Sequence, residues 1–266
     1  MKRIDLNSDM GELPEALADG SQQALMRLVT SVNIASGGHA GTPEMMKQTI
    51  EQALRAKVAI GAHPGYEDRA NMGRVEQKLT PGEVSALVYH QLLNLQEIAD
   101  LCGAHIGHVK PHGALYNQAA RNAQLATAIA DGVAQWCKQR RIHKNEIVLV
   151  GLAGSDMLNS FRAAGFSAAA EAFADRRYES DGALRTRKLE GALLSNPEDA
   201  ATQALRIVEQ RSVLAFDGAT VPIEAETLCI HSDTPGAKKI AEAVNRKLRE
   251  ANISLQPIEK RSLSPF

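Results

Sequence analysis

Residues 31–65 read SVNIASGGHAGTPEMMKQTIEQALRAKVAIGAHPG, and this stretch decides the fold. A short apolar segment at 31–36 precedes a helix-like segment at 42–56, and a second apolar segment follows at 58–62. Strands that are joined by a helix run parallel, because a parallel pair needs a crossover connection of a dozen or more residues. The stretch therefore predicts a βαβ unit.

The helix in this unit carries signals at its start and along one face. Thr42 suits the N-cap, and Pro43 suits the first helical position. Apolar residues recur at Met46, Ile50 and Leu54, a spacing that places them on one face of a helix. We therefore expect this face to pack against the sheet.

The same alternation of strands and helices extends over the whole chain. Further strands are predicted at 3–8, 105–110, 147–150, 167–173 and 227–231. Further helices are predicted at 21–29, 80–102, 122–140, 156–164, 196–210 and 235–250. These units, with no linker between them, predict one α/β domain over 1–266 with a parallel sheet. A small β-hairpin is expected near 213–223, where Asp217-Gly218 stands between apolar runs.

The bulk composition excludes several classes of partner. Hydrophobic residues make up 44% of the 266 residues, which is enough to bury a core. The formal net charge is −1, from 30 basic and 31 acidic residues, so no basic excess exists for a nucleic acid or an anionic membrane. We expect neither as a partner.

The N-terminal segment and the three cysteines indicate a reducing compartment. MKRIDLNSDMGE at the N-terminus has no apolar run of the kind that a secretory signal needs. Cys102, Cys137 and Cys229 are far apart and form no CxxC pair, so neither a disulfide framework nor a structural zinc site is favoured. A cytoplasmic location fits best.

Polar residues gather where the predicted strands end. His39, His63, His112 and His231 follow four different strands, and Lys110 ends one that is predicted to be buried. Functional groups of parallel α/β folds collect at this edge of the sheet. A buried lysine is costly without a charged partner, so we expect Lys110 to face a carboxylate or an anion. This convergence favours a closed barrel over an open doubly wound sheet, which periodicity alone does not separate.

Each of these residues also has a purely structural interpretation. Asp9 could cap the segment after the first strand, and the glycines around His39 could only permit a tight turn. Arg176 and Arg177 beside Asp175 could form a surface ion pair. These interpretations weaken together, because all of them would have to hold at one edge of the sheet.

Several catalytic motifs are missing from the sequence. There is no GxxxxGK[ST] phosphate loop, no GxGxxG after the first strand and no GxSxG elbow. Acid–base chemistry by histidine and carboxylate groups remains, with or without a divalent metal. Asp9, His39 and His63 are the metal-ligand candidates, as a set of two histidines and one carboxylate.

Six ordered motifs carry a resemblance to a known family. They are DLNSDMGE at 5–12, NIASGGHAG at 33–41, GAHPG at 61–65, KPHGALY at 110–116, FADRRY at 173–178 and CIHSDTPG at 229–236. Together they resemble the LamB/YcsF family, whose members are read as one of the subunits of bacterial ATP-dependent 5-oxoprolinase. The motifs cover nearly the whole chain, so the resemblance is specific.

The resemblance implies a fold, a reaction and partners. It implies a seven-stranded parallel (β/α) barrel related to the glycoside hydrolase/deacetylase superfamily. It also implies conversion of 5-oxo-L-proline to L-glutamate with hydrolysis of ATP to ADP and phosphate, with Mg as the companion ion and two other subunits as partners. The catalytic candidates are Asp9, His39, His63, Lys110, His112 and Asp233. The substrate-binding candidates are Asn7, Glu12, Asn33, Tyr116, Asp175, Arg176, Arg177 and His231.

The chain departs from the family pattern at four positions. Ser8 and Ser36 stand where members usually have cysteine, Gly38 replaces a bulky residue, and Thr42 replaces an acidic one. The loss of both thiols argues against either as an obligatory nucleophile. The changes at Gly38 and Thr42 flank His39 and bear on substrate preference.

Two other functions compete with a lactam hydrolase. One is a metal-dependent amide or ester hydrolase acting on acetylated sugars, which the barrel and the metal-ligand candidates suggest. The other is a non-catalytic subunit whose polar edge holds a small acid for a partner. Metal analysis and substitution of His112 separate these alternatives.

Overall fold

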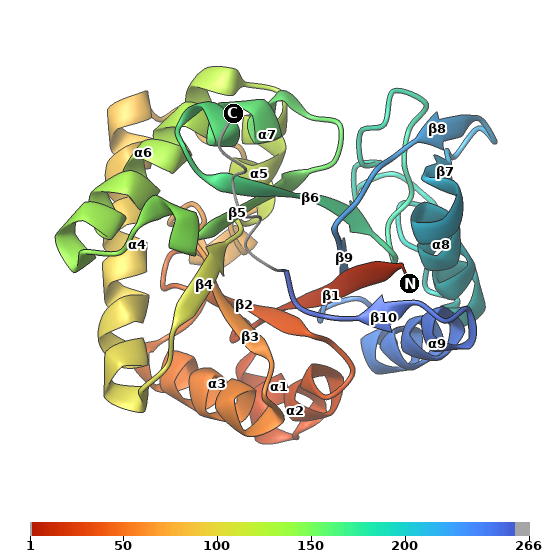
Figure 1. Ribbon diagram of the computed structural model, residues 1–266, viewed down its shortest axis with the longest axis horizontal. Coiled ribbons are helices and arrows are strands. Elements are labelled where there is room, and N and C mark those ends of the chain that lie inside the picture. Colours follow the sequence, from red (N-terminus) through yellow and green to blue (C-terminus); the bar gives the residue numbers. More distant parts are fainter. Residues whose placement is uncertain (1, 259–266) are drawn as a thin grey trace.

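Seven parallel strands close a barrel in the computed structural model, which describes residues 2–258 (Figure 1). Neighbouring strands pair in sequence order from β1 to β6, and β9 closes the barrel by pairing with both β6 and β1. The strands are β1 Arg3–Met10, β2 Ser31–Ala35, β3 Ala59–His63, β4 Ile106–Val109, β5 Val148–Leu152, β6 Ser167–Phe173 and β9 Thr227–Cys229. The predicted seven-stranded parallel barrel is confirmed, and the open sheet is excluded.

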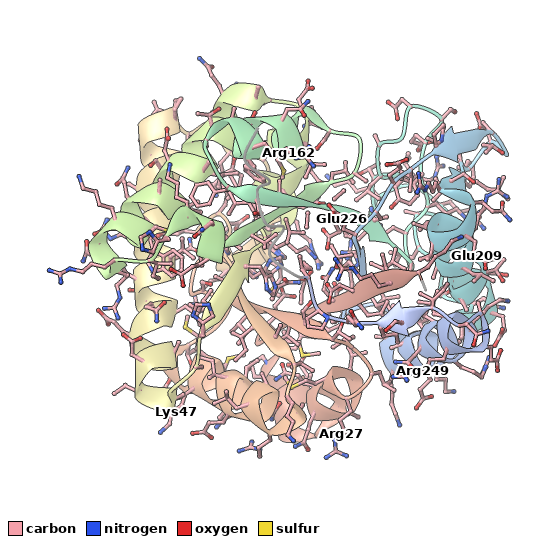
Figure 2. All side chains as sticks on the ribbon, viewed as in Figure 1. Arg27, Lys47, Arg162, Glu209, Glu226 and Arg249 are labelled. Atoms are coloured by element: carbon pink, nitrogen blue, oxygen red, sulfur yellow. The ribbon has the colours of Figure 1, made fainter. Side chains whose placement is uncertain are left out.

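Helices cover the outside of this barrel on all sides (Figure 1). They are α1 Pro14–Ala18, α2 Ser21–Met26, α3 Pro43–Ala56, α4 Pro81–Cys102, α5 Gly113–Ala120, α6 Ala123–Arg140, α7 Asp156–Ala163, α8 Pro197–Gln210 and α9 Ala237–Glu250, with 3-10 turns at Arg69–Asn71 and Lys144–Glu146. Charged side chains such as Arg27, Lys47 and Arg249 are exposed on the outer side of the helical layer (Figure 2). The helices therefore separate the barrel from solvent.

Three short strands lie outside the barrel. β7 (Ser212–Leu214) and β8 (Thr220–Pro222) form an antiparallel pair. β10 (Ser254–Leu255) pairs with Arg3 and Ile4 at the start of β1. The sequence analysis predicted no strand at β10, because two residues are too few to show a period.

Local sequence signals fix several helix boundaries. The Thr42 side chain accepts a hydrogen bond from the Met45 N–H and caps α3. Thr80 and Glu83 form a reciprocal capping box at the start of α4. No helix was predicted at α5, which begins directly after His112 and buries Ala114, Leu115, Tyr116 and Ala119. Its eight residues are too few for a clear helical period, so tertiary packing decides this element.

The hydrophobic core lies mainly between the strands and the helices. Leu92 and Leu95 of α4 and Trp136 of α6 are fully buried there. Burial of a large apolar side chain contributes about 1.5–3 kcal/mol, so this layer stabilises the barrel. Among residues 2–258, no helix is long and apolar enough to cross a membrane.

The interior of the barrel is polar, where such barrels are usually filled by branched apolar side chains. Asp5, Asn7 and Asp9 alternate along β1, and each bonds to other strands. Asp5 accepts hydrogen bonds from Ser31 and Thr227, while burial raises its pKa to about 6. A buried polar group without a partner costs about 1–3 kcal/mol, so these bonds offset the cost of a polar interior. The polar side chains of the interior are thus satisfied by one another across the strands.

Candidate functional site at the C-terminal mouth of the barrel

Lys110 lies at the centre of the polar interior, one residue beyond β4. Its Nζ is 3.0 Å from Asp9 Oδ1 and 2.9 Å from Glu171 Oε1, and it also donates to the Cys229 Sγ at 3.2 Å. The ammonium lies 5.5 Å from the centre of the Phe173 ring. Lys110 therefore faces carboxylates, as expected from its place at the end of a buried strand.

These contacts fix the charges in the interior. Burial alone would lower the pKa of Lys110, but the carboxylates of Asp9 and Glu171 outweigh it and hold the pKa well above its usual value. Burial would raise the pKa of Asp9, but His63 and Lys110 hold it well below the ordinary range. Burial raises the pKa of the Cys229 thiol, which stays protonated. The interior therefore holds a fixed ammonium against a fixed carboxylate, and no thiolate.

Amide and imidazole groups support Asp9 from within the barrel. Asn33 Nδ2 donates to Asn7 Oδ1 and to Asp9 Oδ1, both at 2.8 Å. Burial lowers the pKa of His108 to about 3, so its ring is neutral and its Nε2–H donates to Asn33 Oδ1 at 2.9 Å. A Cβ at Gly61 would lie 2.1 Å from His108 Nε2, so only glycine leaves room for this ring.

A second cluster joins one carboxylate to three imidazoles beside Asp9. Glu12 Oε1 lies 2.9 Å from His39 Nε2, 3.3 Å from His112 Nδ1 and 3.9 Å from His63 Nε2. His63 Nε2 is 3.3 Å from Asp9 Oδ2 and 2.9 Å from His112 Nδ1. The rings of His39 and His112 stack with centroids 3.6 Å apart. Glu12 and the three histidines form a set that could hold a metal ion.

Burial and mutual contacts also set the charges of this cluster. Burial would raise the pKa of Glu12, but His112 and His39 outweigh it and lower the pKa to about 2. Burial, followed by the neighbouring His39, lowers the pKa of His112 well below its usual value. The Glu12 carboxylate is therefore ionised, and burial favours the neutral form of the His112 ring.

A separate pair of residues packs against Phe173. Asp175 Oδ1 is 3.0 Å from His231 Nδ1, and Thr234 Oγ1 donates to Asp175 Oδ2 at 2.6 Å. Burial would raise the pKa of Asp175, but His231 and Thr234 lower it to about 2. The His231 ring stacks on Phe173, with centroids 5.2 Å apart. Asp175 thus orients His231.

A cavity of about 810 Å³ opens over these groups. Its volume lies in the range that is typical of small-molecule sites. Its charged, histidine and aromatic lining residues are Asp9, His63, Arg74, Glu76, Lys110, His112, Tyr116, Arg121, Phe173, Arg176, Asp181, Arg187, Lys188 and His231. Basic side chains outnumber acidic ones in this lining, so the cavity suits an anionic small molecule.

Arg176 is a second buried cation of the cavity wall, besides Lys110. It is 6% exposed and forms no ion pair among residues 2–258. Its Nη2 donates to the Arg185 carbonyl at 2.6 Å, and its Nε has no hydrogen-bond partner among the same residues. Burial and then the nearby Arg187 lower its pKa to about 10, so it stays charged at neutral pH. A buried guanidinium with a free donor is suited to an anionic ligand.

The structure brings most of the predicted site residues together. Asp9, His63, Lys110, His112, Tyr116, Arg176 and His231 line the cavity, and Asn7, Glu12, Asn33, His39 and Asp175 contact these lining residues from behind. Asp233 accepts from Arg187 at 2.9 Å and pairs with Arg74 at the rim. Arg177 is not among the described residues that line the cavity. The roles of all these residues stay predictions.

Three residues of the interior were not predicted from the sequence. Glu171 is fully buried and pairs with Lys110, Cys229 accepts from Lys110, and His108 bonds to Asn33. The signal for Glu171 was available, because it is the one charged residue of the strand SAAAEAF. A charge in an otherwise apolar strand indicates an inward-facing partner.

The positions that depart from the family pattern have structural explanations. Ser8 Oγ donates to the Ile230 carbonyl, and Ser36 Oγ donates to the Ile34 carbonyl, so both hydroxyls serve the backbone. A Cβ at Gly38 would lie 2.5 Å from Gln91 Nε2, which occupies the space of a side chain. Gln91 donates from this place to the Gly65 carbonyl.

The fold and the site together define a (β/α)-barrel protein whose mouth holds a cavity with carboxylate, histidine and lysine side chains in and behind its wall. The model of the LamB/YcsF family matches residues 4–263, and the chain belongs to this family. The A-type subunit of 5-oxoprolinase from Heliobacterium modesticaldum is 44% identical over 254 residues, 96% of this chain and 97% of that protein. The corresponding subunit from Bordetella pertussis is 44% identical over 95% of this chain and 98% of its own length.

Two solved structures resemble the chain to different degrees. The lactam utilization protein from Thermus thermophilus superimposes with a TM-score of 0.86 at 38% identity, covering 96% of this chain and 100% of that one. The family 4 carbohydrate esterase from Streptomyces lividans has a TM-score of 0.51 at 10% identity, covering 98% and 95%. The second likeness shows the fold alone.

Proposed function

We propose that this chain is part of an ATP-dependent lactam hydrolase complex that converts 5-oxo-L-proline to L-glutamate, with hydrolysis of ATP to ADP and phosphate. The observation that supports this most is the cationic cavity, in which an unpaired buried Arg176 lies in the wall and Lys110 faces carboxylates. A small cyclic acid matches both the volume and the charge of this cavity. The names of relatives that are 44% identical point to the same substrate.

The chemistry of the substrate explains the need for ATP and for these side chains. A five-membered lactam is a resonance-stabilised amide whose equilibrium favours the closed ring, so opening must be coupled to another reaction. Transfer of the γ-phosphoryl group to the amide oxygen releases ADP and makes the ring carbon electrophilic. Water then adds, the C–N bond breaks as the nitrogen takes a proton, and a second water releases phosphate.

The side chains suit the charges that develop in this sequence. Lys110 and Arg176 are the cations that would stabilise the phosphoryl group and the developing oxyanion. Asp9 lies at the cavity floor, 3.3 Å from His63, and would take the proton from water. Tyr116 and His231 line the same cavity and would hold the substrate. The proposed companion ion of ATP is Mg, and the proposed location is the cytoplasm, where the free Cys102, Cys137 and Cys229 would stay reduced.

Reconstitution with the two partner subunits tests the proposal. The full complex should hydrolyse ATP in a 5-oxoproline-dependent manner, whereas the isolated chain with ATP and magnesium should form no sustained glutamate. Glutamate formation by the chain alone at the rate of the complex would remove the partner requirement. A complex without 5-oxoproline-dependent ATP hydrolysis would overturn the function, and unchanged turnover with His112→Ala would favour a non-catalytic binding role.

Binding of 5-oxoproline to the isolated chain tests the cavity directly. Arg176→Met should weaken binding, measured by calorimetry, by at least about 10-fold, because a hydrogen bond to a charged group contributes about 1.5–3 kcal/mol. Arg162→Met, an exposed position on α7, is the matched control and should bind like the wild-type chain. Equal affinities of the two variants would exclude Arg176 as the anion partner.

A further inference from the structure

His63 and His112 each place one ring nitrogen against a backbone carbonyl, a feature that does not depend on the lactam reaction. His63 Nδ1 lies 2.7 Å from the Lys110 carbonyl, and His112 Nε2 lies 2.8 Å from the Met72 carbonyl. A carbonyl oxygen only accepts, so each of these ring nitrogens carries the proton and donates it. In the neutral form of each ring, which is the form that binds a metal, the other nitrogen carries a lone pair.

These two lone pairs point at one another. His63 Nε2 and His112 Nδ1 are 2.9 Å apart, and the Glu12 carboxylate oxygen lies 3.9 Å and 3.3 Å from them. His39 Nε2 can donate to the Glu12 oxygen, but a carboxylate oxygen and two ring lone pairs that are buried this close together still repel one another. Glu12, His63 and His112 are each at least nine-tenths buried, so bulk water does not relieve the repulsion. A cation between them would do so.

We propose that Glu12, His63 and His112 bind one divalent transition-metal ion. The spacing of the three donor atoms supports this ligand set. Bonds of about 2.0–2.1 Å to a tetrahedral zinc ion place neighbouring ligand atoms about 3.3 Å apart. The three observed separations of 2.9, 3.3 and 3.9 Å lie around this value. Two imidazoles and one carboxylate are ligands that Zn²⁺, Co²⁺ or Ni²⁺ accept, whereas Mg²⁺ prefers oxygen ligands only.

The surroundings of the three ligands also match those of a metal site. Ligating histidines usually donate their other N–H to a backbone carbonyl or a carboxylate, and both His63 and His112 do so. His39 Nε2 lies 2.9 Å from Glu12 Oε1, which orients the carboxylate toward the cluster. His39 thus acts as a positioning residue. Asp9, 3.3 Å from His63 on the cavity side, remains beside the ion.

This set differs from the one that the sequence suggested. Asp9, His39 and His63 were the metal-ligand candidates, but Asp9 Oδ1 is already held by Lys110 and Asn33. His112 Nδ1 instead lies 2.9 Å from His63 Nε2 and 3.3 Å from Glu12 Oε1, a contact that the sequence spacing did not indicate. A rival set, formed by Asp9, Cys229 and His231, lies in the same interior.

Metal binding by the purified chain tests the inference without an activity assay. The chain, purified without added metal, is analysed by mass spectrometry for transition metals and is then stripped with a chelator. The stripped chain is titrated with Zn²⁺ by calorimetry and with Co²⁺ by visible absorption. We expect about one equivalent per chain, and a higher unfolding temperature in the presence of Zn²⁺.

Variants locate the ion. Glu12→Gln and His112→Gln should each weaken Zn²⁺ binding by at least about 100-fold, since loss of even a residue that only orients a ligand costs about 10–100-fold. His105→Gln, an exposed histidine, is the matched control and should bind with unchanged affinity. Circular dichroism checks that each variant is folded. Glu12→Gln replaces only a carboxylate oxygen by an amide nitrogen, so it keeps the test available if His112→Gln fails to fold.

Two results would overturn the inference. The first is a folded, stripped wild-type chain that binds neither Zn²⁺ nor Co²⁺, which would mean that a shared proton joins the two rings. The second is a Co²⁺ spectrum with a thiolate charge-transfer band that persists in Glu12→Gln and disappears in Cys229→Ser. That spectrum would assign the ion to the rival set.

Discussion

Replacing Lys110 by methionine should destabilise the fold far more than the loss of one surface lysine. Lys110 Nζ lies 3.0 Å from Asp9 Oδ1 and 2.9 Å from Glu171 Oε1, and all three side chains are buried. Methionine has a similar length but no charge, so two carboxylates lose their cation. The variant tests whether the ammonium holds the interior of the barrel together.

The expected magnitude follows from the burial of the pair. Removing one partner of a buried ion pair costs about 3–5 kcal/mol, because it leaves an uncompensated charge. For a chain of this size, each kcal/mol lowers the midpoint of thermal unfolding by about 2–4 °C. Lys110→Met should therefore unfold about 6–20 °C below the wild-type protein at neutral pH.

The stability lost in Lys110→Met should also depend on pH, because Lys110 sets the pKa of Asp9. The pKa of Asp9 is held well below its ordinary value, so its contribution to stability is present above the unfolded pKa and is lost as pH falls through the folded pKa. Without Lys110 that pKa rises, and protonation relieves the unpaired charge. The gap in unfolding free energy between Lys110→Met and wild type should therefore narrow as the pH falls from about 7 toward about 4.

Urea unfolding at several pH values, followed by circular dichroism, measures this gap. Lys47→Met, an exposed position on α3, is the control for the change in side chain. The double variant Lys110→Met/Glu171→Gln should recover part of the lost stability, because one unpaired carboxylate is removed. If Lys110→Met loses no more stability than Lys47→Met at neutral pH, or if the gap does not change with pH, the argument from buried charges is wrong.

Three further predictions concern the site and its supports. Gly38→Ala should lower the free energy of unfolding, measured with urea, by about 1–3 kcal/mol, because the added Cβ overpacks its surroundings. Gly82→Ala is the control and should not lower it, because a Cβ at Gly82 meets no atom within 4 Å. Below about pH 4, Asp175→Asn should lose less stability per pH unit than the wild-type chain. The folded pKa of Asp175 is about 2, so the ionised carboxylate stabilises the wild-type fold above its unfolded pKa, and this contribution is lost as the pH falls toward 2. Lys110→Ala should cut turnover of the reconstituted complex by about 100-fold or more, and full activity would remove Lys110 from the mechanism.

The order of the helices and strands could be predicted from the sequence, because each element depends on a pattern of nearby residues. The apolar runs and the caps at Thr42 and Thr80 depend on residues a few positions apart, and the structure has these elements. The position of polar residues at strand ends was equally visible, since a parallel barrel places all these ends at one mouth. Short elements without a period, such as α5 and β10, were not visible.

The sequence alone determined a parallel α/β chain with histidines, carboxylates and a lysine at one end of its strands. Only the tertiary structure decided which of these groups meet. Asn7 bonds to Thr227 across 220 positions of sequence, and Glu171 reaches Lys110 between strands that are not neighbours in the sheet. Such contacts depend on barrel closure and on register, which are set by the packing of the whole chain and leave no trace in local spacing.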